Sequence, residues 1–296
     1  MWLADQWNDY EVIDCSKGEK LERWGDYLLV RPDPQVIWDT PKKEKGWRKM
    51  NGHYHRSSKG GGEWEFFQLP KEWTIQYSLP INKKLTFHLK PFSFKHTGLF
   101  PEQAANWNWF SQLIADAVSK GRQVKVLNLF AYTGGATLAA AVAGASVTHV
   151  DASKGMVTWA KENAISSGLK DAPIRWLVDD CVKFLEREIR RGNHYDAIIM
   201  DPPSYGRGPK GEIWKIEESV YPLIQLCSQI LTDNPLFFLI NSYTTGLQPA
   251  VLSYMISTVL GTANGTVTAS EIGLPVSSNG LVLPCGASGR YEATGI

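Results

Sequence analysis

From residue 124 onward, short apolar runs alternate with helical segments in strict order, and this pattern constrains the fold more than any other feature. Five runs predict buried strands, each followed by a helical segment. The runs span residues 124–130, 146–151, 174–180, 195–201 and 236–242. Such alternation is typical of a parallel sheet covered by helices on both faces. Two further apolar segments near the C-terminus have no helix between them and predict an antiparallel hairpin at the edge of the sheet.

The first 95 residues have a different sequence pattern. Short runs of aromatic and β-branched residues, broken by Pro and Gly, occur at 26–32, 64–69, 73–79 and 85–94. Runs of this kind predict strands. We therefore expect a small β-rich domain over residues 1–95, which is a candidate for substrate contact, and an α/β domain over residues 96–296.

Composition argues against several classes of protein. No stretch approaches 18 apolar residues, and the N-terminus lacks a basic segment followed by an apolar one. Neither a membrane span nor a secretory signal is therefore expected. The four cysteines, Cys15, Cys181, Cys227 and Cys285, are widely spaced, which argues against a zinc site or a disulfide framework. We expect a cytoplasmic protein with no metal and no membrane partner.

A basic stretch spans residues 42–59. It carries seven Lys or Arg residues against one acid, Glu44, with Trp47 and Tyr54 between them. Cations for phosphates and rings for base stacking are what an RNA contact needs, while a solvated hairpin loop explains the same composition. Both interpretations stay open. The cations that would contact RNA are Lys42, Lys43, Lys45, Arg48 and Lys49.

Ligand-binding residue types follow the predicted strands, and open parallel sheets bind ligands beyond the carboxyl ends of their strands. The first strand runs into Thr133, Gly134 and Gly135, where a glycine turn opens a helix and frees backbone N–H groups. Asp151 ends the second strand and suits ribose hydroxyls. Asp179–Asp180 end the third, where one carboxylate could reach an adenine and the other cap the helix. Together these strand ends predict a ligand that contains adenosine.

The fourth strand ends in Asp201–Pro202–Pro203–Ser204–Tyr205. Two consecutive prolines make a stiff turn that can hold the Asp201 carboxylate beside a ligand and place the Tyr205 ring beneath a planar substrate. Methyl transfer from a sulfonium depends mainly on such positioning. The glycine turn also lacks the G-x-G-x-x-G spacing of a pyrophosphate site, so S-adenosylmethionine is favoured over NAD. The residues expected at the methyl-transfer centre are Asp201, Pro202, Pro203 and Tyr205.

Two cations, Arg207 and Lys210, follow this turn. They would hold a backbone phosphate of RNA, or they would lie in a solvated loop. Both interpretations stay open here as well.

These motifs resemble the class I S-adenosylmethionine-dependent methyltransferases of the bacterial 23S ribosomal-RNA group, which modify cytosine C5 or guanine N7. The resemblance covers residues 92–245 and is carried by "NLFAYTGG", "VDASKGMVTWAKENA", "DDCVKFL" and "DAIIMDPPSYGRG". It implies a Rossmann-like fold, S-adenosylmethionine as cofactor and a base in ribosomal RNA as substrate. It further implies a methionine end lined by Phe130, Tyr132, Thr133 and Gly134, a ribose held by Asp151 and Ser153, an adenine held by Asp180, and Asp201 in the methyl-transfer pocket.

The sequence departs from the cytosine-C5 members at one point. Those enzymes use a cysteine thiolate to attack the ring, but Ser204 and the segment Asn241–Ser242–Tyr243 occupy the places where the relatives carry it. The segment is closer to the guanine-N7 type, whose acceptor has its own lone pair. Two alternatives remain open: a methyltransferase for a small molecule or a protein, and a non-catalytic RNA-binding relative. A NAD-dependent dehydrogenase ranks last.

Overall fold

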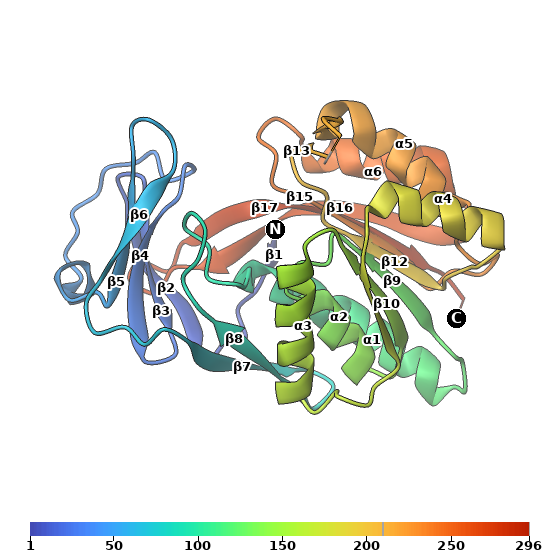
Figure 1. Ribbon diagram of the computed structural model, residues 1–296, viewed down its shortest axis with the longest axis horizontal. Coiled ribbons are helices and arrows are strands. Elements are labelled where there is room, and N and C mark those ends of the chain that lie inside the picture. Colours follow the sequence, from blue (N-terminus) through green and yellow to red (C-terminus); the bar gives the residue numbers. More distant parts are fainter. Residues whose placement is uncertain (209, 296) are drawn as a thin grey trace.

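The main sheet has eight strands and confirms the predicted α/β, Rossmann-like architecture. The computed structural model describes residues 1–208 and 210–295 (Figure 1). The strand order is β1-β16-β17-β15-β12-β9-β10-β11. β17 runs antiparallel to β15 and β16, as predicted for the C-terminal hairpin, and the other pairs are parallel. The strands are β1 (Trp2–Leu3), β9 (Lys125–Leu129), β10 (Ser146–Asp151), β11 (Ile174–Val178), β12 (Ala197–Met200), β15 (Phe237–Ser242), β16 (Gly265–Pro275) and β17 (Val282–Ala293).

Helices cover both faces of this sheet, as the alternation predicts. Alternate residues of β12 therefore enter different cores: Ala197 and Ile199 pack on one side, Ile198 and Met200 on the other. Burying such a side chain stabilises the fold by roughly 1.5–3 kcal/mol. One face carries α1 (Ala104–Ser119), α2 (Gly135–Val142) and α3 (Lys154–Ser166), and the other carries α4 (Cys181–Arg191), α5 (Ile216–Ser228) and α6 (Pro249–Leu260) (Figure 1). Among the described residues no helix is long and apolar enough to cross a bilayer.

The N-terminal region forms a five-stranded sheet and a separate hairpin. The four predicted runs correspond to β4, β6, β7 and β8, whereas β2, β3 and β5 lie outside them. The missed strands carry the sequences YEVIDCS, EKLERW and GHYHR, in which charged and polar residues interrupt the apolar pattern. The elements are β2 (Tyr10–Ser16), β3 (Glu19–Trp24), β4 (Tyr27–Pro32), β5 (Gly52–Arg56) and β6 (Gly62–Phe66), then β7 (Trp73–Leu79) and β8 (Lys83–Leu89), with a short 3-10 helix η1 (Lys45–Arg48).

The predicted boundary between residues 95 and 96 needs one correction. Residues 2–3 belong to the main sheet, because β1 pairs in parallel with β16 and covers its outer edge. Trp2 is held there by the Arg290 guanidinium, 3.7 Å above its ring. The N-terminal sheet and the α/β region also share one hydrophobic core. This core contains Trp24 of the N-terminal sheet together with Phe87 of β8 and Trp107 of α1. The β-rich region is therefore packed onto the α/β region rather than linked to it.

Candidate active site

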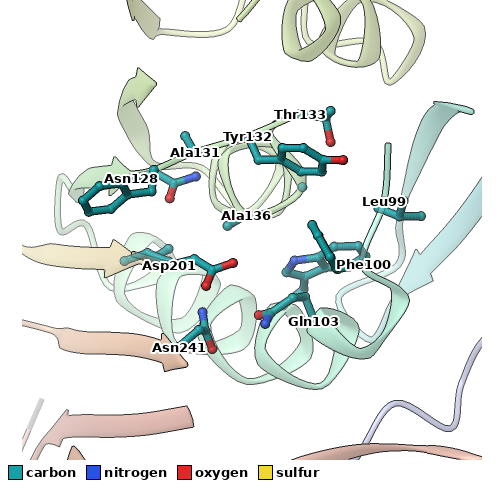
Figure 2. A pocket seen from close by; sticks show the side chains of 14 residues that line it. Leu99, Phe100, Gln103, Asn128, Ala131, Tyr132, Thr133, Ala136, Asp201 and Asn241 are labelled. Carbon is teal, nitrogen blue, oxygen red and sulfur yellow. The ribbon is translucent and has the colours of Figure 1, made fainter. Parts of the chain in front are cut away.

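A pocket opens at the carboxyl ends of β9, β12 and β15, the edge of the sheet at which ligand binding is predicted (Figure 2). Four of the predicted residues line it: Phe130, Tyr132, Thr133 and Asp201. The polar ends of Gln103, Asp201 and Asn241 point into the same space in Figure 2. The structure thus brings together groups from three strand ends and from the start of α1.

The wall after β9 is a strained loop. Phe130 and Tyr132 adopt left-handed backbone angles, with φ of 55° and 53°, which are costly for residues other than glycine and concentrate at functional sites. Local bonds hold the loop: Tyr132 N donates to Asp151 Oδ2 at 2.8 Å, and Thr133 Oγ1 donates to Gly98 O at 2.6 Å. Gly134 has φ of 85° and caps α2, with its Cα facing Ala160 too closely for a Cβ. The loop therefore presents its aromatic residues to the pocket in a fixed conformation.

Asp151, Ser153 and Asp180 lie outside the pocket lining. The two oxygens of Asp151 accept bonds from Tyr132 N and from Ser153 N, the latter at 2.9 Å, so this carboxylate joins two strand ends. Ser153 Oγ caps α3 by accepting from Met156 N at 3.3 Å, and Asp180 Oδ1 caps α4 by accepting from Lys183 N at 2.9 Å. These hydrogen bonds give Asp151, Ser153 and Asp180 structural roles. Their contacts to ribose and adenine stay predictions.

The third strand end contains two carboxylates with different surroundings. Asp179 forms an ion pair with Arg187 and accepts a bond from Asp180 N at 2.8 Å. Asp180 is the one that caps the helix. The helix cap and the predicted adenine contact therefore fall on the same residue, Asp180, and not on two different ones. The cap engages Oδ1 of Asp180, so Oδ2 is the oxygen that could bind a ligand.

Asp201 is the acid at the centre of the pocket. Burial and the nearby Glu102 carboxylate raise the pKa of Asp201 to about 7. Among the described residues no Lys or Arg side chain forms an ion pair with Asp201. Pro202 is buried and Pro203 is exposed, so the first proline anchors the turn. A partly buried carboxylate without a cation partner fits a positively charged ligand group such as a sulfonium or an ammonium.

Asn241 lies opposite this acid at the end of β15. Its Oδ1 accepts from Asn106 Nδ2 at 3.1 Å and from Ser288 Oγ at 2.6 Å. Both bonds orient the amide, and its nitrogen points to the pocket in Figure 2. Arg290 anchors the far side of this network through Asn106 Oδ1. The structure therefore presents a fixed N–H donor to the space beside Asp201.

Sequence reasoning missed one side of the pocket, which includes Phe100, Gln103 and Trp107. They come from the short 3-10 turn before α1 and from α1 itself. Gln103 Nε2 donates to Tyr243 Oη at 2.8 Å, and the Phe100 ring lies 5.7 Å from that of Tyr243. The available signal was the segment "FPEQ", in which a proline opens the helix that precedes the first strand of the α/β region.

Tyr205 does not lie in the pocket, which corrects its predicted place beneath the substrate. The residue begins the strand β13 (Tyr205–Arg207), which pairs with β14 (Ile213–Lys215). Its side chain is 51% exposed, and Tyr205 Oη accepts from Arg207 Nε at 2.9 Å. This exposed ring is not among the residues that line the pocket, whereas Phe100 and Tyr132 are aromatic residues that do. Lys210 is exposed in the same hairpin.

The rings of the basic stretch are buried, which contradicts their predicted stacking role. Trp47 packs with Leu21 and Val30 on the opposite face of the N-terminal sheet from the shared core. Trp47 Nε1 donates to Asp14 Oδ2 at 2.9 Å, and Tyr54 is also buried. These rings fill the sheet's own cores, so they are not available to a base.

The cations of that stretch divide into two groups. Lys42 forms an ion pair with Glu19 at 2.9 Å and lies over the Trp47 ring. Arg56 and Lys59 are exposed on the β5–β6 hairpin. The other exposed cations are Lys43, Lys45, Arg48 and Lys49. They lie on or next to η1, on the outer side of the N-terminal sheet, so they do not border the pocket.

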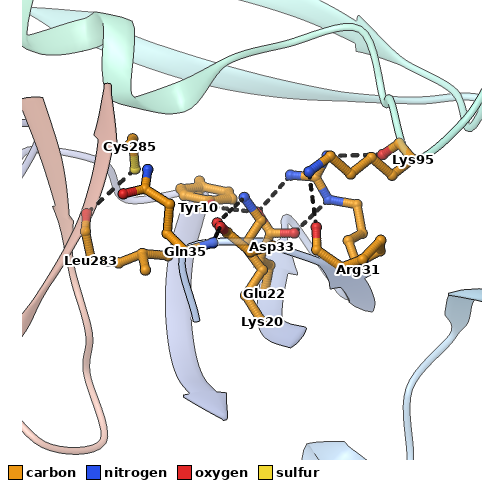
Figure 3. Close-up of polar contacts among 10 residues, drawn as sticks. Tyr10, Lys20, Glu22, Arg31, Asp33, Gln35, Lys95, Leu283 and Cys285 are labelled. Atoms are coloured by element: carbon orange, nitrogen blue, oxygen red, sulfur yellow. Dashed lines mark hydrogen bonds and ion pairs between the residues drawn. The ribbon is translucent and has the colours of Figure 1, made fainter. Parts of the chain in front are cut away.

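All four cysteines are among the described residues, and none of them lines the pocket. Cys181 lies behind the strained loop, where its sulfur accepts from Phe130 N at 3.4 Å. Cys285 donates to Leu283 O at 3.4 Å and lies near the buried polar cluster drawn in Figure 3. Burial raises the pKa of the thiols of Cys15, Cys181, Cys227 and Cys285. The cysteines are therefore neutral thiols at neutral pH and poor nucleophiles.

The comparisons with known proteins agree with this geometry. A family model of S-adenosylmethionine-dependent methyltransferases matches residues 53–216. A SAM-dependent methyltransferase from Agrobacterium tumefaciens, known from its crystal structure, is 36% identical, with a TM-score of 0.88 over 97% of this chain and 91% of its own. This chain belongs to the S-adenosylmethionine-dependent methyltransferases. The cofactor of the methyltransferase is therefore S-adenosylmethionine.

More distant structures share the methyltransferase fold. A structure of the methyltransferase SMU.776 complexed with SAH has a TM-score of 0.71 at 20% identity, covering 97% of this chain and 76% of its own. Ribosomal RNA large subunit methyltransferase K/L from Pseudoalteromonas atlantica is 28% identical over 76% of this chain and 33% of its own length. Its counterpart from Shewanella baltica is 37% identical over 47% of this chain and 18% of its own length. The chain thus spans a third or less of these relatives.

Proposed function

We propose that this methyltransferase methylates a base in RNA, with ribosomal RNA as the favoured class of substrate. The observation that carries the proposal is the similarity, over 76% of the chain, to relatives named for ribosomal RNA. The site supports the same reading, because its polar groups gather beside the cofactor pocket at the strand ends. A ribosomal RNA substrate also supports a cytoplasmic location for the enzyme.

The proposed roles in cofactor binding follow the strand ends. Phe130, Tyr132, Thr133 and Gly134 hold the methionine end, Asp151 and Ser153 the ribose, and Asp180 the adenine. Asp201, supported by Pro202 and Pro203, lies at the methyl-transfer centre. S-adenosylmethionine supplies an electrophilic methyl group on a sulfonium. The chain's own residues orient the two reactants, because in-line transfer needs positioning more than covalent help.

The methyl acceptor that the site favours is a ring nitrogen with its own lone pair, as in guanine N7. Transfer to cytosine C5 needs a thiolate, and no thiol lines the pocket. The Asn241 amide N–H can donate to an acceptor on the base, while the ionised Asp201 carboxylate stabilises the positive charge that the base gains. Arg207 and Lys210 are proposed to contact the RNA backbone near the pocket mouth.

The test is methyl transfer from labelled S-adenosylmethionine to unmodified 23S ribosomal RNA made by transcription, followed by digestion to nucleosides. We expect label in a methylated guanosine and none in 5-methylcytidine. The Asp201→Ala variant serves as the inactive control. Label in protein or small-molecule fractions, with none in RNA, would establish the alternative substrate class instead.

A further inference from the structure

The β5–β6 hairpin carries an aromatic and basic surface on one side. Side chains of a strand alternate between the two faces of the sheet. Tyr54 pairs with Trp64 and Arg56 with Gly62 in the register of these strands, so Arg56, Trp64 and Phe66 share one face. Together with Phe94 and Lys95, from the loop that follows β8, these three residues form what we call the hairpin face.

The aromatic rings of the hairpin face are unusually exposed. Trp64 and Phe66 stack with centroids 6.0 Å apart and an interplanar angle of 9°, and Phe66 is 56% exposed. Phe94 is 63% exposed at the tip of its loop and has a left-handed φ of 59°. The loop is closed by a bond from Phe92 N to His96 O at 3.1 Å. A strained backbone that holds a phenylalanine in water points to a ligand for that ring.

Direct contacts join the hairpin face to the cofactor pocket. Trp64 Nε1 donates to Phe92 O at 3.3 Å. The Phe92 ring then packs 5.1 Å from Trp159 and 6.5 Å from Tyr132 of the pocket loop. Figure 1 shows the loop after β8 running between β6 and the helices of the main sheet. A strand of RNA that enters the pocket can therefore continue onto this surface.

A charged cluster lies at the base of the same loop, and in it Arg31 is paired with Glu22 and Lys20 with Asp33 (Figure 3). Lys95 Nζ donates to Pro32 O at 3.0 Å, and Arg31 donates to Lys95 O at 2.9 Å. Burial and the neighbouring cations Lys20, Arg31 and Arg56 lower the pKa of Lys95 to about 8. Within the described part of the chain no carboxylate forms an ion pair with Lys95 or Arg56, so these are the two cations that can meet a phosphate.

The acids of β6 point away from the hairpin face. Glu63 and Glu65 alternate with Trp64 onto the opposite side, where Glu65 lies 3.8 Å from His55. These carboxylates therefore do not repel a phosphate chain that lies on the hairpin face. Charge and aromatic rings on this side are complementary to a nucleic acid strand.

We propose that the hairpin face binds the single-stranded RNA next to the methylated base. Phe66 and Phe94 stack on bases, and Arg56 and Lys95 contact phosphates, as in other single-strand platforms. The inference rests on the proposed RNA substrate and names the surface that holds it. It replaces the predicted contact through Lys42, Lys43, Lys45, Arg48 and Lys49, since the Trp47 ring among them is buried and the exposed cations lie on the outer side of the sheet.

The test measures RNA binding by the full chain saturated with SAH. The probe is a fluorescein-labelled single-stranded RNA of about 15 nucleotides, observed by fluorescence anisotropy. Phe66→Ala and Phe94→Ala should each weaken binding by roughly 5- to 100-fold, the range for loss of one stacked base. Arg56→Gln should lower the slope of log affinity against log salt by about 0.7.

The matched control is Tyr254→Ala, which removes a ring that is 74% exposed on α6. It should bind RNA like the wild type, and every variant should keep its affinity for SAH. If Phe66→Ala and Phe94→Ala bind RNA as tightly as wild type, the hairpin face is not the RNA-binding surface. That result would leave the proposal of an RNA substrate unchanged. Absence of RNA binding and RNA methylation in the wild type, with SAH still bound, would instead overturn the proposed function together with the face.

Discussion

Asp201 is the residue whose protonation sets the charge at the methyl-transfer centre. Its pKa is raised to about 7, so only part of the population is ionised at neutral pH. If the ionised form stabilises the cationic base, kcat/KM, which reports groups of the free enzyme, should rise about tenfold per pH unit below 7 and level off above it. Asp201→Asn should give a low rate with this rise absent. Values of kcat/KM for S-adenosylmethionine between pH 5.5 and 8.5 test the prediction, and an unchanged profile in the variant would assign the titration to another group.

The same shift predicts an effect on stability. A raised pKa means that the favourable contribution of Asp201 is full below about pH 4 and is lost as pH rises through about 7. Removing the charge should therefore stabilise the cofactor-free protein at pH 8. We expect Asp201→Asn to raise the free energy of unfolding by roughly 2–3 kcal/mol at pH 8 and by little at pH 4. Urea denaturation at the two pH values measures the difference, and an equal effect at both would contradict it.

Asp151 and Asp201 should differ in what they contribute. Asp151 holds the pocket loop and the turn before α3 through its two oxygens. Asp151→Ala should weaken SAH binding by tenfold or more, since a charge-assisted hydrogen bond contributes about 1.5–3 kcal/mol. Asp201→Ala should mainly reduce turnover. Calorimetric titration with SAH and steady-state rates separate the two effects, and equal losses of affinity would argue against this division.

At the scale of the element, the junction of the pocket loop with α2 depends on close packing. A Cβ on Gly134 would lie 2.9 Å from the Cβ of Ala160, at a φ of 85°. Gly134→Ala should therefore lower stability by about 2–3 kcal/mol through the combined clash and backbone strain. Gly168→Ala is the matched control, because Gly168 has a φ of 76° with open space around it. The difference in melting temperature between the two variants measures the effect of the clash with Ala160. Equal melting temperatures would mean that backbone strain alone accounts for the loss of stability.

At the scale of the whole molecule, the two sheets should unfold together. Trp24, Phe87 and Trp107 belong to one buried cluster that spans the N-terminal and main sheets, and β1 extends the main sheet from the start of the chain. A shared core makes separate unfolding of either layer costly. Urea transitions followed by tryptophan fluorescence and by far-UV circular dichroism should coincide. Two resolved transitions would show that the N-terminal sheet is an independent domain.

Several features of the molecule could be predicted from the sequence because they depend on near neighbours. The alternation of apolar runs and helical segments predicts the parallel strands β9, β10, β11, β12 and β15, since each run buries side chains on both faces. The two C-terminal segments without a helix predict the β16–β17 hairpin. Asp201 and the loop after β9 could be located at the pocket because parallel strands end on the same edge.

Other features were decided by contacts between residues far apart in the chain. Trp47 lies among Lys and Arg residues in the sequence, yet its side chain is buried with Leu21 and Val30. Tyr205 follows the proline turn in the sequence, yet it pairs with Lys215 in a hairpin and its ring is exposed. Gln103 reaches the pocket only because α1 packs beside the strand ends. The hairpin face likewise exists because the loop after β8 returns to β6. Sequence patterns set which face of an element is apolar, but the tertiary fold alone sets which faces meet.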